Sequence, residues 1–183
     1  MANESEMTPV DVPRLPKKVE ADAGAEKLAS ELVARARPLW NGTDLAVAQV
    51  DLGADLEAAL KGAFSSGRIV RGYEDAQRVL AAEQHGLSRV DEKTGVVRGG
   101  RVSRLLVLAD DGAERFYRNV ESMLRRHAPR VLALRLSVNE RELGGLFFGG
   151  DQVAKLLLVE HKDAVSAVLL ALAAQWSSAT EQP

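Results

Sequence analysis

The feature that most constrains the fold is an uninterrupted run of four apolar residues, Leu105 to Leu108, in the middle of the chain. A strand with one face in water alternates apolar and polar residues. A run without alternation is typical of a strand that is covered on both faces. Such strands lie in sheets that carry helices on each side. The run therefore predicts a central strand of an α/β domain.

Helical and strand patterns alternate along the sequence on both sides of this run. Leu52, Leu56, Leu60 and Phe64, for example, recur at the spacing of one helix face. This alternation predicts a three-layer α/β/α sandwich around a mixed central sheet. The patterns indicate helices at about 23–37, 51–64, 73–84, 114–127, 139–148 and 164–176, strands at 68–71, 131–136 and 155–160, and a strand or linker at 45–50.

The sequence also predicts how the chain is divided. Residues 1–22 combine prolines and charges without apolar periodicity, which is typical of a disordered tail. Residues 23–50 are expected to form an N-terminal helix and linker, residues 51–176 the α/β domain, and residues 177–183 a C-terminal tail. Within the domain, Val90 and Val96 flank the turn-like stretch Asp-Glu-Lys-Thr-Gly, which predicts an inserted hairpin at about 85–99.

Composition excludes several classes of protein. The chain has no cysteine, which rules out disulfides, thiolate catalysis and cysteine-bound metals. The first residues lack the order of charges and apolar residues seen in a secretory signal, and the longest apolar stretch, 164–174, is too short to cross a bilayer. We therefore expect a cytoplasmic protein without membrane contact, cofactor or metal.

No constellation of residues points to catalysis. Asp110 and Asp111 follow the central strand, but no glycine-rich phosphate loop accompanies them. His161 has no candidate nucleophile near it in sequence. A turn of polar residues and a solvated histidine are the simpler interpretations. We therefore expect a binding protein and not an enzyme.

Charge gives two opposing indications about nucleic acid. The formal net charge of the chain is −2, which does not favour indiscriminate binding to nucleic acid. Residues 67–104, however, hold eight basic and five acidic side chains, an excess of three positive charges. A solvated face accounts for such a run as readily as a phosphate-binding surface does.

Two segments, with a third element after them, resemble one known family. The first is Gly-Arg-Ile-Val-Arg-Gly-Tyr-Glu-Asp-Ala-Gln-Arg at 67–78, and the second is Gly-Arg-Val-Ser-Arg followed by the central strand and Ala-Asp-Asp at 100–111. Glu-Leu-Gly at 142–144 then precedes the last strand. This order resembles the L-seven-Ae ribosomal protein superfamily, which binds kink-turn RNA, over about residues 51–174. The third domain of archaeal and eukaryotic class-one release factors shares this fold and is the nearest rival.

The resemblance implies a particular RNA site. The glycine pair lets the backbone approach a phosphate, and the first turn of the following helix presents free N–H groups to an anion. The family's Asn, Glu and Lys positions fall on Glu74, Asp75 and Arg78, of which only Arg78 keeps the family's character. The residues implied in RNA binding are Gly67, Arg68, Arg71, Gly72, Glu74, Asp75, Arg78, Arg101 and Arg104, with Ser137, Val138 and Asn139 as a second wall against an extruded base.

These observations lead to a leading hypothesis and an alternative. The hypothesis is a non-enzymatic RNA-binding accessory protein of the translation apparatus, whose partner is structured RNA such as rRNA or tRNA, or the ribosome. The alternative is a protein-interaction module of the same fold that has lost RNA binding. The acidic Glu74 and Asp75 favour this alternative because carboxylates repel phosphates.

Overall fold

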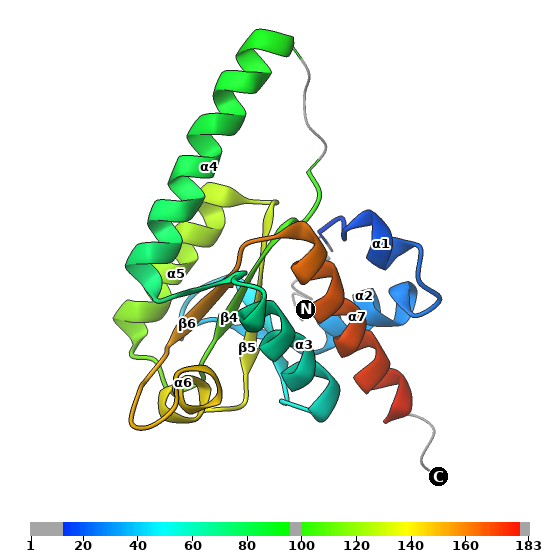
Figure 1. The fold of residues 1–183 in the computed structure, drawn as a ribbon, viewed down its shortest axis with the longest axis vertical. Helices are drawn as coiled ribbons and strands as arrows, with labels where there is room; N and C mark the ends of the chain where they lie inside the picture. The colour runs from blue at the N-terminus through cyan, green and yellow to red at the C-terminus, as the bar shows by residue number, and fades with distance from the viewer. Residues whose placement is uncertain (1–12, 96–99, 180–183) are drawn as a thin grey trace, which may run out of the picture.

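The central apolar run lies in a six-stranded mixed sheet with helices on both faces (Figure 1). The computed structural model describes residues 13–95 and 100–179. Over these residues the elements are α1 (Lys17–Glu20), α2 (Ala25–Ala34), β1 (Ala36–Pro38), β2 (Ala46–Val50), α3 (Ala54–Ser65), β3 (Ile69–Arg71), α4 (Tyr73–Thr94), β4 (Arg104–Leu108), α5 (Glu114–His127), β5 (Val131–Leu136), α6 (Glu140–Phe148), β6 (Leu156–Val159) and α7 (Lys162–Ser178).

The strands lie in the order β1-β2-β5-β4-β6-β3. β2, β5 and β4 are parallel, whereas β6 is antiparallel to both of its neighbours, β4 and β3. β3 therefore runs in the direction of β4, and β6 is the reversed strand between them. We call the edge where β4 ends the carboxyl-end edge and the edge where it begins the amino-end edge.

β4 lies between two separate apolar layers, as the sequence predicts. Leu105 and Val107 pack into the layer formed with α2, α3, α6 and α7, and Leu106 and Leu108 pack into the layer formed with α4 and α5. All four side chains are buried. The predicted α/β/α sandwich with a mixed sheet is confirmed, and β4 is one of its central strands.

The predicted hairpin at 85–99 is wrong over the residues that the structure describes. α4 continues without a break to Thr94 and ends at Gly95, which has a left-handed φ of 66°. Val90 is therefore a residue of the helix and not of a strand, and Gly95 is the cap of the helix and not part of a hairpin turn. Residues 96–99 lie outside the described part of the chain. The distal half of α4 projects from the body of the molecule (Figure 1).

The N-terminal boundaries also differ from the prediction. Residues 13–22 of the predicted tail contain α1, and Leu15 and Val19 are buried in the layer with α7. Residues 1–12 lie outside the described part. α2 ends at Ala34, so residues 36–38 are free to pair with β2, and residues 23–50 belong to the sandwich instead of preceding it. The apolar side chains at four-residue spacing in 15–19 drive this packing.

The C-terminal boundary shifts slightly. α7 continues to Ser178, two residues beyond the predicted end of the domain, and residues 180–183 lie outside the described part. Among the described residues, no helix has the length and apolar character that crossing a membrane requires.

Replacement of Leu106 by Asp is expected to abolish folding, because the side chain is fully buried and the change would bury an unpaired charge. Val90→Asp is the matched control, since Val90 is 41 % exposed on the projecting part of α4. Urea unfolding followed by circular dichroism measures both. A folded Leu106→Asp variant with a normal unfolding midpoint would contradict this account of the core.

Candidate nucleic-acid interface

Arg71 is held inside the fold at the carboxyl-end edge. It ends β3, and its Nη2 donates to the Val153 carbonyl at 2.5 Å while Nη1 donates to Gln152 Oε1 at 3.2 Å. Its guanidinium lies 4.5 Å from the ring centroid of Phe148. The side chain joins the loop before β6 to β3, and these contacts orient its guanidinium toward the loop.

The glycines on either side of β3 are required by backbone conformation. Gly67 has a φ of 67° and Gly72 a φ of 89°, and a Cβ at either position would meet nothing within 4 Å. Both conformations favour glycine without any close approach of a ligand. The exposed Arg68 follows the first glycine, and α4 begins directly after the second with Glu74 and Asp75 in its first turn. Arg78 forms an ion pair with Asp75.

Arg101 and Arg104 do not extend the surface around Arg71, which corrects that expectation. Arg71 is level with Val107 through β6, whereas Arg104 begins β4 at the other edge. Arg104 binds both carboxylate oxygens of Glu83 on α4. Arg101 donates to the Leu15 carbonyl at 2.8 Å and forms an ion pair with Glu20. The predicted arginines therefore lie in separate places.

The predicted second wall lies at the carboxyl-end edge after β5. Asn139 caps α6, since its side chain accepts from the backbone N–H groups of Arg141 and Glu142. Ser137 accepts from the side chain of Gln49, and the Val138 carbonyl accepts from the Asp110 N–H. These groups serve the local structure. The strands β4 and β6 separate them from Arg71.

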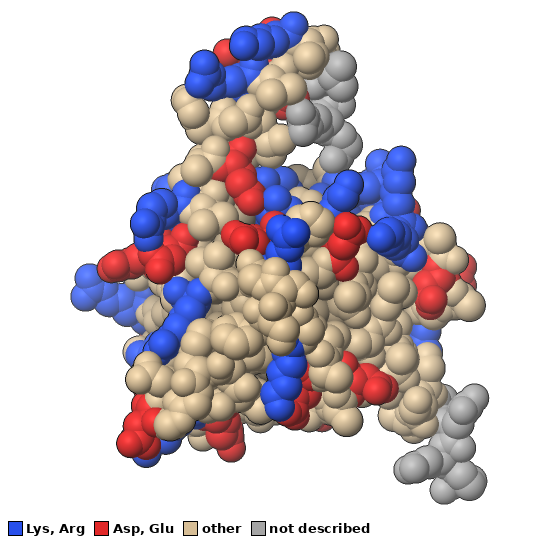
Figure 2. All heavy atoms as spheres, viewed as in Figure 1, with Lys and Arg blue, Asp and Glu red and all other residues tan. Residues whose placement is uncertain are grey.

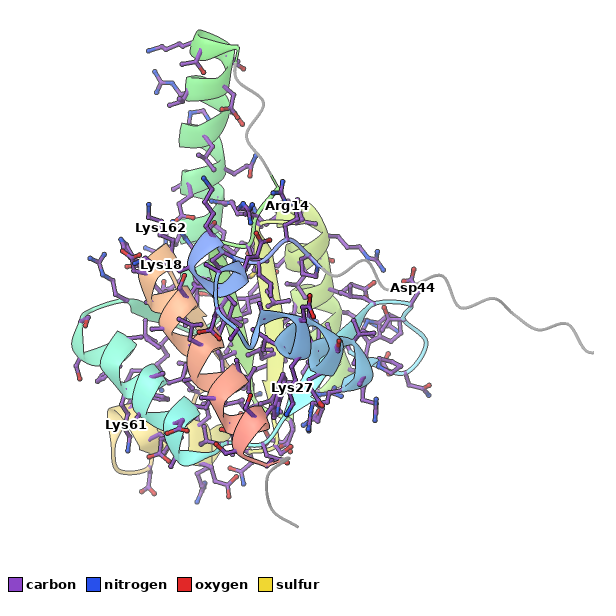
Figure 3. All side chains as sticks on the ribbon, turned by 90° about the vertical axis from the view of Figure 1, so that its right-hand side faces the viewer. Arg14, Lys18, Lys27, Asp44, Lys61 and Lys162 are labelled. Atoms are coloured by element: carbon purple, nitrogen blue, oxygen red, sulfur yellow. The ribbon has the colours of Figure 1, made fainter. Side chains whose placement is uncertain are left out.

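A hollow with basic side chains lies at the amino-end edge. Its volume is about 410 Å³, and it lies between α1, the start of β4 and the first turns of α7. Figure 3 shows Lys18 and Lys162 side by side where α1 meets the start of α7, and Arg14 on the neighbouring segment. Lining residues are Pro16, Lys17, Lys18, Arg101, Val102, Ser103, Lys162, Asp163 and Ser166, which we call the amino-end hollow.

Positive charge exceeds negative charge in this hollow. Four of its side chains are basic and one, Asp163, is acidic. The hydrogen bond from Lys18 holds the pKa of Asp163 below its usual range, and Lys162 contributes through its charge. The Lys18–Asp163 pair is exposed on both sides, so it is weak and leaves Lys18 available to another anion. In Figure 2, Lys and Arg side chains gather over α1 and the start of α7.

The carboxyl-end edge carries the opposite charge. α3, α4, α5 and α6 all begin there after parallel strands, and each has acidic residues in its first turn. Carboxylates at these positions stabilise the helix dipoles. α7 begins at the amino-end edge because β6 is reversed, and its first turn contains Lys162 beside Asp163. The basic side chains of the hollow are thus at the opposite edge of the sheet from these acidic first turns.

Three of the basic residues of the hollow were missed at the sequence level. Lys17 and Lys18 were assigned to the disordered tail, and Lys162 was passed over as the residue after His161. The signal that could have found the first two is Leu15 and Val19, an apolar pair at helical spacing that brackets them. Nothing in the sequence brings Lys162 near them, because that proximity depends on the reversed direction of β6.

A second hollow has a different character. It holds about 300 Å³ and is lined mainly by apolar residues of α2, β1, β2, α5 and β5. It lies where the amino halves of β2 and β5 separate, since these strands pair only from Ala48 and Leu134 onward. Within residues 13–95 and 100–179, no group of three or more His, Asp or Glu side chains is placed to hold a metal ion.

An ionic cluster lies near the amino-end edge between α4 and α5. Glu83 binds Arg104, and it also accepts from Nη1 of Arg130 at 3.0 Å. His127 is 3 % exposed and lies beside this pair. Burial lowers the pKa of His127, and the nearby charges of Arg130 and Arg126 lower it further, against a smaller opposing effect of Glu83. We call Glu83, Arg104, His127 and Arg130 the Glu83 cluster.

The comparisons with known proteins identify no family. No protein-family model matches the chain, and no curated protein matches it. Among solved structures, a protein of unknown function from Bacillus halodurans matches 67 % of this chain and 99 % of its own length, with 17 % sequence identity and a TM-score of 0.44. A likeness at this level carries no argument about function. The functional argument therefore depends on the chain's own geometry.

The lowered pKa of His127 predicts a pH dependence of stability. Below the ordinary histidine pKa of about 6.5 the unfolded chain binds a proton that folded His127 resists, so this residue makes the free energy of unfolding fall as the pH falls. The slope from one proton is at most about 1.4 kcal/mol per pH unit. His127→Leu is expected to flatten the profile between pH 7 and pH 5, measured by urea unfolding.

The control for this measurement is His85→Gln, because His85 is exposed on the projecting part of α4. It is expected to keep the parent's profile. If His127→Leu loses as much stability on acidification as the parent does, the buried histidine is not the source of the pH dependence.

Proposed function

We propose that this chain is an RNA-binding protein without catalytic activity, and that RNA phosphates bind at the amino-end hollow. The observation that carries the proposal is the gathering of Lys17, Lys18, Arg101 and Lys162 around one concavity. Lysine and arginine side chains around a hollow supply the sequence-independent part of nucleic-acid affinity. The net charge of −2 argues only against binding over the whole surface.

The separation of charge supports an oriented mode of binding. Acidic first turns at the carboxyl-end edge repel the phosphate backbone, and the basic side chains at the amino-end edge attract it. The RNA would therefore approach from the side on which α4 projects (Figure 1). Arg89 and Lys93 are exposed on that projection and are placed to meet the same RNA.

The kind of RNA follows from the resemblance in sequence. The segments at 67–78 and 100–111 resemble the L-seven-Ae superfamily, and the α/β/α sandwich is compatible with that fold. We infer on this basis that the RNA is structured and belongs to the translation apparatus, and that the protein acts in the cytoplasm. The location of the hollow differs from the site that the resemblance implies, so two sites have to be compared in the test.

A protein-interaction module is the second candidate. It is favoured by the ion pairs of Arg101 with Glu20 and of Arg104 with Glu83, because these carboxylates compete with a phosphate for the two arginines. Both candidates assign the chain to binding and not to catalysis.

The double variant Lys17→Glu/Lys18→Glu is expected to weaken RNA binding at least about tenfold at moderate salt and to flatten the dependence of the logarithm of affinity on the logarithm of salt by about 0.7 per lost contact. Both side chains are exposed, so the fold should be retained. Fluorescence anisotropy with a labelled structured RNA at several salt concentrations measures both quantities.

Two further double variants carry the same change in charge. Lys61→Glu/Arg141→Glu alters exposed residues away from the hollow and is expected to have little effect. Arg68→Glu/Arg78→Glu tests the site implied by the resemblance. A loss of binding in this variant alone would move the RNA site to the start of α4. Equal binding by the parent and by the Lys17→Glu/Lys18→Glu and Arg68→Glu/Arg78→Glu variants would refute both sites, and absence of RNA binding by the parent would favour the protein-interaction module.

A further inference from the structure

The Glu83 cluster leaves buried hydrogen-bond donors without an acceptor. Nε and Nη2 of Arg130 are buried and have no hydrogen-bond partner among residues 13–95 and 100–179, and the same holds for both ring nitrogens of His127. Burying such groups without partners is unfavourable, because they lose their hydrogen bonds to water and gain none in return. A cluster with several of them calls for a ligand that accepts hydrogen bonds.

The geometry of Arg130 specifies the chemistry of that ligand. Nε and Nη2 form the side-on edge of a guanidinium, where two parallel N–H groups match two oxygens of a carboxylate or phosphate. The remaining nitrogen, Nη1, is already bound to Glu83. The edge best suited to an oxyanion is thus the edge without a partner.

The net charge of the Glu83 cluster also favours an anionic ligand. Two guanidinium groups share the single carboxylate of Glu83, which leaves one positive charge uncompensated. Arg126, on the same helix as His127, adds a further positive charge that reaches the histidine. If Glu83 moves away, two positive charges remain, and a phosphate group with two negative charges would neutralise them.

Glu83 is well placed to be displaced. It lies on α4, whose buried residues are Ala76 and Leu80, and the distal half of this helix projects from the body (Figure 1). Glu83 therefore attaches α4 to the body about one turn beyond the last of these buried residues, through its ion pairs with Arg104 and Arg130. Exchanging its carboxylate for an external anion replaces the ion pairs that Glu83 forms with Arg104 and Arg130.

We propose that the Glu83 cluster is an oxyanion site that takes a phosphate group on Arg130, Arg104 and His127, with Glu83 as the internal anion that the ligand displaces. The phosphate comes either from an RNA backbone or from a small phosphorylated compound. The site stands independently of the RNA proposal. Its residues lie near the same edge of the sheet as the amino-end hollow, but none of them lines that hollow.

The test is calorimetric titration of the full chain with inorganic phosphate, with chloride replaced at constant ionic strength. Saturable binding is expected for the parent. Arg130→Gln should weaken it about 10- to 100-fold, the loss of one or two charge-assisted hydrogen bonds. Glu83→Gln should strengthen it about tenfold or more, because the competing carboxylate is gone.

The opposite signs of these two effects keep the proposal falsifiable. A variant that merely damages the fold cannot bind phosphate more tightly than the parent. Arg115→Gln, which removes an exposed charge at the start of α5, is the matched control and should change nothing. Absence of binding by the parent and by Glu83→Gln overturns the site, and so does equal binding by the parent, Arg130→Gln and Glu83→Gln.

A second arm identifies the source of the phosphate once the first has shown binding. If the ligand is an RNA backbone, inorganic phosphate competes with structured RNA and Arg130→Gln weakens RNA binding more than Arg115→Gln does. If it is a small phosphorylated compound, both variants bind RNA as the parent does. Phosphate binding by a protein that binds no RNA would support this site and refute the proposed function, so the two failures are distinguishable.

Discussion

The burial of β4 on both faces is the constraint on which the rest of the structure depends. Four consecutive apolar side chains cannot be covered by one layer, because successive residues of a strand point to opposite faces. Leu105 and Val107 require one layer of helices, and Leu106 and Leu108 require another. β6, with its own four buried residues, makes the same demand beside it. The sandwich is the arrangement that satisfies both strands at once.

The distribution of charge follows from the direction of the strands. Helices that follow parallel strands begin at the carboxyl-end edge, and acidic residues in their first turns stabilise them there. β6 is antiparallel to β4, so α7 begins at the other edge and brings Lys162 to α1. One reversed strand thus brings together residues from the two ends of the chain. Lys18 and Asp163, which form an ion pair in the hollow, are 145 positions apart in the sequence. The dipolar surface is a consequence of topology as much as of composition.

Local sequence patterns predicted where helices and strands lie better than they predicted which tertiary contacts these elements make. The helix at 114–127 and the strand at 131–136 were placed at their observed bounds, because apolar period and flanking residues agree there. The helix predicted at 73–84 is too short because Gly86, a residue typical of a helix end, lies inside α4, and Val90, a residue typical of a strand, lies on the same helix. Leu15 and Val19 were missed because their burial depends on α7, which lies far along the chain. Where the deciding contact is distant, local pattern carries no information about it.

At the candidate sites, the difference between what local sequence predicts and what distant contacts decide is larger still. Sequence marked the arginines at 71, 101 and 104 as basic residues of one region, but each found an acceptor within the chain, and these acceptors lie in three different places. Which arginine is engaged depends on pairings such as Glu83 with Arg104, which are set by how α4 packs on β4 and not by the residue types. Residue type gives the sign of a charge, whereas tertiary packing decides whether that charge is available.

Glu83 shows why the availability of charge is a functional question in this fold. Ion pairs that are largely removed from water recover their desolvation cost only with excellent geometry and a full set of hydrogen bonds. Glu83 meets this condition with Arg104, which binds both of its oxygens, but two buried nitrogens of Arg130 have no partner in the part of the chain that the structure describes. Apolar residues at these positions would hold α4 against α5 at lower cost. An ionic contact that is incompletely satisfied among the described residues is one for which an external anion can compete, whereas an apolar contact offers an anion nothing to bind.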